Sequence, residues 1–186
     1  MSAMPSHRAG SGTGLRMTAQ AVGAYGEKVA EAELLRHGWV PANVNASIRN
    51  NADYDIFAQK GSQVMLVRVK TCGPGQDAFQ FSFPVGRDIA IEHLHPNDVT
   101  ILIRMGGRRQ DDQCYAMPTA TLWSFIELHR ASYLNRLTRD GKPLVDTGQW
   151  TLRLPARRDG VDRPNYGFED KLRAYLDNWE FADRPG

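Results

Sequence analysis

The sequence contains few of the features that mark secreted or membrane-spanning proteins. Its two cysteines, Cys72 and Cys114, lie far apart and lack the spacing of metal ligands. Reduced thiols in a cytoplasmic protein are therefore expected. No apolar run approaches the ~18 residues that a membrane-spanning helix needs, and the N-terminal stretch has no apolar signal-peptide core. We accordingly expect no membrane contact.

An excess of charge of one sign is also missing. The chain has 23 Lys and Arg against 21 Asp and Glu, and this net charge of +2 is too small to identify a nucleic-acid binder. The glycine-rich GSGTG segment is not a phosphate-binding loop, because no Gly-Lys-Ser or Gly-Lys-Thr follows it. What is present is a hydrophobic content of 41%, which is enough for one substantial core in a globular protein of this length.

Composition divides the chain into three parts. Residues 1–17 are rich in glycine, serine and other small residues and are expected to form a disordered tail. Residues 18–139 carry the strongest apolar periodicity and are expected to form the core. In residues 140–186 turn formers and arginines are frequent, and this part is expected to be an appendage whose final helix, Phe168 to Trp179, packs on the core.

Periodicity within these parts predicts an α/β (α+β) fold, with a mixed central β-sheet of four or five strands flanked by helices. Three phenylalanines at period two are more typical of a core than of a base-stacking surface. A near-continuous apolar run indicates a central buried strand. The predicted elements are helices from Thr18 to His37 and from Pro118 to Leu137, and strands at Phe79–Phe83, Val99–Met105, Cys114–Met117 and Trp150–Leu154.

The stretch ADYDIFAQKGSQVMLVRVKT, residues 52–71, contains two short apolar strands joined by a turn. If Gly61-Ser62 is a two-residue hairpin turn, Lys60 pairs with Gln63, and the register follows outward from that pair. This interpretation depends on the register, because a slip of one residue would move every side chain to the other face.

The same register brings charged residues together on one face of the hairpin. Asp55 lies opposite Arg68, and Asp53 lies opposite Lys70. Charges on a half-buried sheet are costly unless they are paired, bound to a metal or used in chemistry. The hairpin is therefore the candidate functional site.

Three segments in order carry a known pattern. The helix GEKVAEAELLRHGW bears Glu27, the step Asp55-Ile56-Phe57 enters the hairpin, and the next strand reads Arg68-Val69-Lys70-Thr71. This arrangement resembles the core of the PD-(D/E)XK nuclease superfamily, in which a helical Glu and a hairpin Asp precede a strand reading Glu or Gln, any residue, then Lys. The resemblance spans about residues 22 to 118 and implies a restriction-endonuclease-like fold.

The resemblance also implies a chemistry. In the family, the Asp and the Glu or Gln bind a divalent cation, and the Lys helps to position the attacking water. It implies that Asp55, with Asp53 or Glu27, would bind Mg²⁺ or Mn²⁺, and that Glu27, Asp55 and Lys70 would be the catalytic residues. The implied partner is DNA, with RNA as the alternative.

Arg68 departs from the family pattern, because it stands where the family carries Glu or Gln. A guanidinium has no lone pair to offer a cation. In one interpretation Asp53 and Glu27 supply the missing oxygens and Arg68 contacts a phosphate, which gives an attenuated nuclease. In the other, Arg68 forms a cross-strand ion pair that locks the site. The chain would then be a catalytically degenerate relative that binds nucleic acid or a protein partner. The sequence leaves both interpretations open, together with a homodimer.

Overall fold

The computed structural model describes residues 17–44, 54–83, 85, 94–153 and 169–179. The tail predicted for residues 1–17, apart from Met17, lies outside these residues, as does Asp53. No helix among the described residues is both long and apolar enough to cross a membrane. The elements are α1 (Ala19–Arg36), β1 (Val40–Asn43), β2 (Ile56–Lys60), β3 (Gln63–Cys72), β4 (Ala78–Ser82), β5 (Asp98–Arg104), the 3₁₀ helix η2 (Arg109–Asp111), β6 (Gln113–Pro118), α2 (Thr119–Leu134), β7 (Gln149–Arg153) and α3 (Glu169–Arg173).

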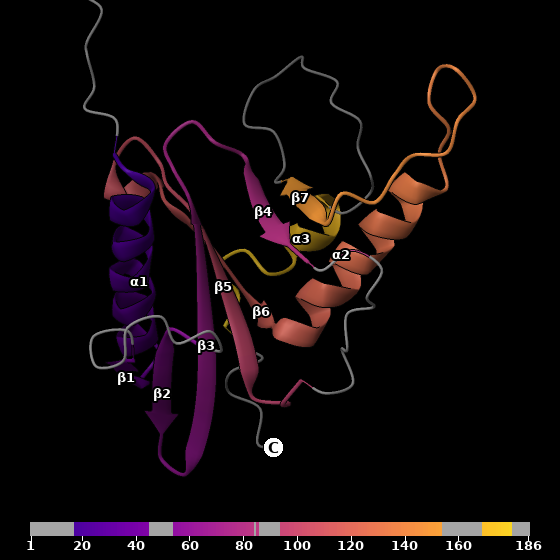
Figure 1. Cartoon of the computed structure of the whole chain (residues 1–186). Helices are drawn as coiled ribbons and strands as arrows, with labels where there is room; N and C mark the ends of the chain where they lie inside the picture. Colours follow the sequence, from indigo (N-terminus) through magenta and orange to yellow (C-terminus); the bar gives the residue numbers. More distant parts are fainter. Residues whose placement is uncertain (1–16, 45–53, 84, 86–93, 154–168, 180–186) are drawn as a thin grey trace, which may run out of the picture.

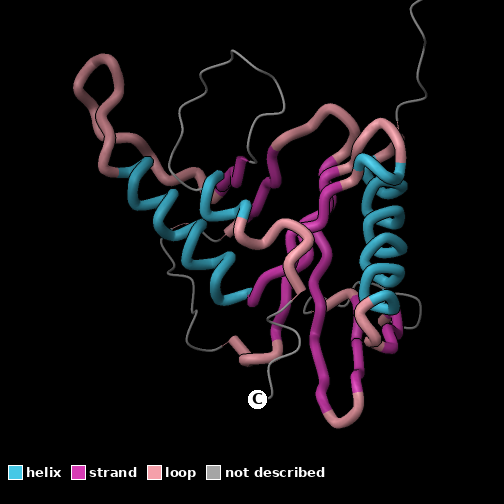
Figure 2. The backbone as a smooth tube through the Cα atoms, turned by 180° about the vertical axis from the view of Figure 1, so that it is seen from behind, coloured by secondary structure: helices cyan, strands magenta, loops and turns pink. Residues whose placement is uncertain are grey.

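Five strands form the central sheet in the order β1-β2-β3-β5-β6, and β4 and β7 form a second, two-stranded sheet. The β3–β5 pair is parallel, whereas β1–β2, β2–β3 and β5–β6 are antiparallel. Helix α1 covers one face of the central sheet, and α2, α3 and the small sheet lie on the opposite side (Figures 1 and 2). The predicted mixed sheet of four or five strands flanked by helices is confirmed.

Helix α1 matches its predicted limits because its start is specified locally. The Thr18 hydroxyl accepts a hydrogen bond from the Ala21 amide at 3.2 Å, which caps the first turn. The buried face of α1 includes Val29, Ala30 and Leu34, which pack on the inward side chains of the sheet. This packing forms the first of two hydrophobic cores.

The second core lies on the other face of the sheet. Phe79 and Phe81 of β4 are buried there against Trp150 of β7, Leu122 of α2 and Leu172 of α3. The alternating phenylalanines are therefore core residues, as their spacing predicted. Both cysteines are free and buried, in agreement with the expectation of reduced thiols.

The helix predicted from Phe168 to Trp179 is wrong beyond Arg173. After α3 the chain runs alongside β6, where the carbonyl of Tyr175 accepts from the Ala116 amide at 3.1 Å and the Asp177 amide donates to the Cys114 carbonyl at 2.8 Å. Buried backbone groups need hydrogen-bond partners. The hydrogen bonds that this segment makes with the edge of β6 therefore decide its conformation, in place of the helix that its periodicity predicted.

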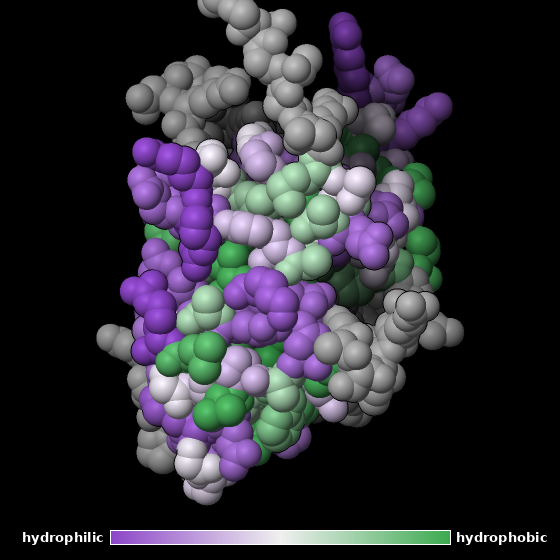
Figure 3. All heavy atoms as spheres, turned by 90° about the vertical axis from the view of Figure 1, so that its left-hand side faces the viewer, coloured by the Kyte–Doolittle hydropathy of each residue, from purple (hydrophilic) through white to green (hydrophobic). Residues whose placement is uncertain are grey.

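The other edge of the central sheet carries Pro41. Hydrogen-bonded pairs alternate along an antiparallel ladder. The Val44 amide donates to the Asp55 carbonyl across the β1–β2 ladder. Because the direction of the backbone nitrogen reverses at each residue, the nitrogen of Pro41, three residues earlier, points away from β2. A proline there removes a donor from the exposed edge. Figure 3 shows the side of the molecule that carries α1 and β1, where hydrophobic side chains are interspersed with hydrophilic ones.

A polar cluster attaches α1 to the connection between β5 and β6. The Tyr25 hydroxyl donates to the Asp112 carboxylate, and Arg109 lies 2.8 Å from Glu33 and 3.7 Å from Asp112. Burial, followed by the hydrogen bond to Asp112, raises the pKa of Tyr25 to about 12. The neutral phenol is therefore the form that stabilises the folded protein.

We predict that Gly26→Ala destabilises the protein while Gly23→Ala does not. A Cβ on Gly26 would lie 1.7 Å from the Thr71 hydroxyl oxygen, so α1 would have to move away from β3. A Cβ on Gly23, in the same helix, meets nothing within 4 Å. We expect Gly26→Ala to lower the free energy of unfolding by about 1–3 kcal/mol, and Gly23→Ala to raise it by up to about 1 kcal/mol. Urea denaturation measures both, and an equal effect would contradict the close approach.

A second prediction concerns high pH. The ordinary pKa of tyrosine is 10.0 and that of Tyr25 in the folded protein is about 12. The stability that Tyr25 contributes is therefore fully present below pH 10 and is lost as the pH rises through about 12. The difference in unfolding free energy between wild type and Tyr25→Phe should shrink across this range, as measured by urea denaturation at several pH values. A difference independent of pH would refute this role for the hydroxyl.

Candidate functional site

The hairpin that carries the candidate site has the predicted register. Lys60 pairs with Gln63, and the ladder continues to the pair Ile56–Val67. Gly61 has a φ of 60°, the positive value that a two-residue hairpin turn requires at its first central position. The turn chemistry was therefore sufficient to place the two strands relative to each other.

The ladder ends one pair before the predicted Asp55–Arg68 pair. The Asp55 amide donates to the Val67 carbonyl at 2.8 Å, and the Asp55 carboxylate accepts from the Val69 amide at 2.7 Å. In a continued ladder the Val69 amide would donate to the Tyr54 carbonyl. A hydrogen bond to an ionised acceptor is stronger than one to a neutral carbonyl, so the carboxylate takes the place of the backbone where β2 leaves the sheet.

Arg68 and Lys70 project from β3 on the face opposite α1. The residues that alternate with them, Val67 and Val69, pack into the core beneath α1. Both cations are exposed, and the ammonium nitrogen of Lys70 lies 5.8 Å from the centre of the Phe81 ring. Two cationic side chains therefore stand together on an accessible part of the central strand.

Glu27 reaches the same end of the hairpin from α1. Its carboxylate accepts a hydrogen bond from the Asn43 side-chain amide at 2.9 Å, and Asn43 also donates to Glu31 at 3.0 Å. Asn43 is paired with Ile56 in the β1–β2 ladder, next to Asp55. Sequence reasoning missed Asn43, because its role depends on a pairing between strands that no local signal reveals.

The donors available for a metal ion are carboxylate oxygens. Among the described residues, no group of three or more His, Cys, Asp or Glu side chains is arranged to hold a metal ion. Mg²⁺, however, is commonly held by one or two carboxylates together with substrate phosphates. Asp55, oriented by the Val69 amide, and Glu27, oriented by Asn43, fit that donor type, whereas Arg68 does not.

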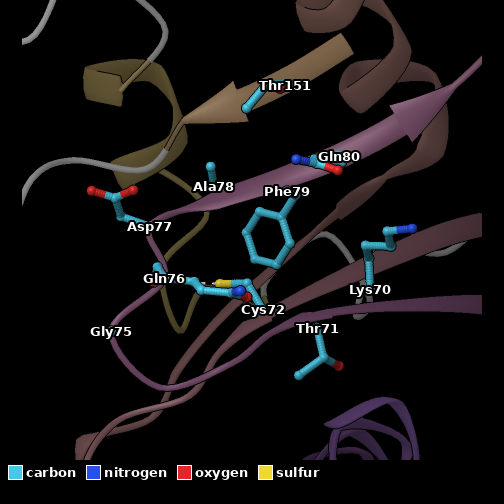
Figure 4. Close-up of a pocket in the computed structure, with 10 residues that line it drawn as sticks. All are labelled: Lys70, Thr71, Cys72, Gly75, Gln76, Asp77, Ala78, Phe79, Gln80 and Thr151. Carbon is cyan, nitrogen blue, oxygen red and sulfur yellow. Dashed lines mark hydrogen bonds between the residues drawn. The ribbon is translucent and has the colours of Figure 1, made fainter. Parts of the chain in front are cut away.

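Lys70 also lies at the rim of a pocket of about 560 Å³ between β3 and β4 (Figure 4). Cys72 and Phe79 form its buried part, and Gln80 comes from the edge of β4. Burial raises the pKa of the Cys72 thiol to about 11, so this cysteine is protonated at neutral pH. This pocket was not predicted from the sequence, because the strands that enclose it meet only in the folded chain.

Comparisons with known proteins bear on the fold. No protein-family model matches the chain, and no curated protein matches it by sequence. Among solved structures, it is similar to the bacterial homing endonuclease I-Ssp6803I, with a TM-score of 0.52 and 11% identity over 89% of this chain and 93% of that one. The chain therefore shares the fold of this endonuclease, a restriction-endonuclease-like fold as the sequence predicted. At this identity the likeness concerns the fold alone.

Two further structures are more distant. The Holliday junction resolvase Hjc of Archaeoglobus fulgidus gives a TM-score of 0.43 at 13% identity, over 88% of this chain and 98% of that one. MepB gives a TM-score of 0.35 at 9% identity, over 69% of this chain and 80% of that one.

We predict that Asp55→Ala destabilises the protein more than Asp55→Asn. Alanine leaves the Val69 amide without its acceptor, which costs about 1–3 kcal/mol. Asparagine keeps an oxygen in the same place and should lose less. Urea denaturation at neutral pH measures both variants. Equal losses would mean that the carboxylate does not act through this hydrogen bond.

Proposed function

We propose that this protein acts on DNA as a nuclease, with the phosphodiester bound over Arg68 and Lys70 on the open face of β3. The observation that carries the proposal is the position of the Asp55 carboxylate, which is bonded to the amide of Val69. That amide lies between Arg68 and Lys70 in the chain, so the carboxylate is held at the short stretch of the central strand that carries the two cations.

Each side chain has a role that follows from its chemistry. Arg68 would bind a phosphate through its planar guanidinium, and Lys70 would stabilise negative charge that develops on the phosphate or orient the attacking water. Asp55, with Glu27 or Asp53, would hold Mg²⁺ or Mn²⁺. A bound divalent cation would neutralise charge on the transferring phosphate and lower the pKa of a water molecule.

Arg68 limits this activity. Its positive charge stands where a nuclease of this fold carries a metal-binding or polar residue, and it weakens the attraction of Asp55 for a cation. We therefore propose a slow enzyme, whose rate rises when Arg68 is replaced by the family's glutamine.

A second candidate function is DNA binding without cleavage. It is favoured by the same arginine, whose guanidinium offers no lone pair to a cation. In this case Asp55 would serve only as the acceptor for the Val69 amide, and Arg68 and Lys70 would hold a phosphate without breaking it. RNA or a protein partner would be the alternative ligand.

Cleavage and binding assays separate the two functions. Plasmid, linear, single-stranded and branched DNA are incubated with Mg²⁺ or Mn²⁺ and with wild type, Lys70→Ala, Arg68→Gln and the control Lys142→Ala, which removes an exposed lysine in the turn after α2. We expect slow cleavage by wild type, a loss of about 10²-fold or more in Lys70→Ala, faster cleavage by Arg68→Gln, and no change in Lys142→Ala.

Fluorescence anisotropy on the same DNA in EDTA measures binding independently of cleavage. Binding that Lys70→Ala weakens, with no cleavage by wild type or Arg68→Gln, would replace the nuclease by the binding protein. No binding to any DNA at low salt would overturn both candidate functions.

A further inference from the structure

The pocket beside Lys70 has walls from two sheets. Lys70 and Cys72 belong to β3 of the central sheet, and Phe79 and Gln80 belong to β4 of the small sheet. In Figure 4 the Phe79 ring points from β4 toward Cys72, and the pocket lies between the two strands. Its volume of about 560 Å³ is within the range of pockets that hold small organic groups.

The edge of β4 that borders this pocket offers backbone hydrogen-bonding groups. The Phe83 amide donates to the Gly148 carbonyl, and hydrogen-bonded pairs alternate along the antiparallel β4–β7 ladder. The backbone N–H and C=O of Gln80 therefore point away from β7, toward the pocket. The same alternation directs the N–H of Ala78 to this edge.

The turn that leads into β4 is held in place. The Gln76 amide donates to the Gly73 carbonyl at 3.0 Å, and the Gln76 side-chain oxygen accepts from the Gly73 amide at 2.8 Å. The Cys72 thiol donates to the Gln76 carbonyl at 3.7 Å. These contacts hold the turn that lines one end of the pocket.

The groups that line the pocket suit a nucleobase better than a second phosphate. Lys70 and Asp77 carry opposite charges, while Gln80 and Thr151, which are register partners across β4 and β7, supply neutral donors and acceptors. A phosphate requires an excess of cations or amide donors, whereas a base edge requires a mixture of donors and acceptors such as these.

We infer that this pocket holds one unpaired base of the DNA strand whose phosphate lies over Lys70. The inference rests on the proposed function and specifies its substrate class. Lys70 belongs to both sites, so the base of the bound nucleotide or of its neighbour enters the pocket directly. A base in a duplex reaches such a pocket only after leaving the stack, which costs free energy that an unpaired base does not need. The substrate is therefore single-stranded or branched DNA in preference to an intact duplex.

The test is a set of binding measurements by fluorescence anisotropy in EDTA. The ligands are a single-stranded oligonucleotide, the same strand with one abasic position at its centre, a branched duplex and a blunt duplex. The proteins are wild type, Gln80→Ala, Thr151→Phe, which places a large ring among the lining residues, and Ser82→Ala, at an exposed position on the same face of β4 as Gln80 that does not line the pocket.

We expect wild type to bind single-stranded and branched DNA at least about tenfold more tightly than the blunt duplex. Gln80→Ala and Thr151→Phe should remove most of that preference while leaving duplex binding unchanged, and Ser82→Ala should behave as wild type. The abasic strand should bind more weakly than the intact strand.

Two results would overturn the inference, and they are distinguishable. If wild type binds DNA through Lys70 but shows no preference for unpaired strands, or keeps it in Gln80→Ala and Thr151→Phe, the pocket is not a base subsite and the proposed function stands. If wild type binds no DNA of any form, the inference fails together with the proposed function. Circular dichroism on each variant shows whether it is folded, so that unfolding is not mistaken for a loss of binding.

Discussion

The Val69 amide of β3 needs a hydrogen-bond acceptor at the point where β2 has left the sheet. The Asp55 carboxylate supplies it. This contact lies where the β2–β3 ladder ends, and it holds a negative charge at the stretch of β3 that carries Arg68 and Lys70. The fold and the candidate site therefore depend on the same hydrogen bond. Beyond it, β3 continues as the central strand of the sheet and carries Lys70, which lines the pocket.

The alternation of β3 divides the molecule into two halves with different roles. Val67 and Val69 pack against α1. Because Gly26 has no side chain, the helix can lie close to β3. Arg68 and Lys70, one residue out of phase, stay on the open face. A binding site is held more precisely when its side chains stand on a rigid element, and a strand whose other face packs in the core provides that support.

Local signals in the sequence were sufficient for the elements whose geometry is decided within a few residues. The Thr18 cap, the Gly61 turn and the register that follows from it are examples. The departure of Asp55 from the ladder, the role of Asn43 and the early end of α3 could not be predicted in this way. Each is decided by a backbone group on another strand, and that group becomes a neighbour only after the chain has folded.

The two outer strands of the central sheet have consequences for how copies of this protein behave at high concentration. Pro41 removes a donor from one outer strand, and the segment after α3 occupies hydrogen-bonding groups of the other. Growth of the sheet from one molecule into the next, the step by which cross-β fibres begin, is disfavoured at both of these positions. Self-association at these two strands would have to proceed through side chains, which substitutions can adjust without disturbing the backbone of the central sheet.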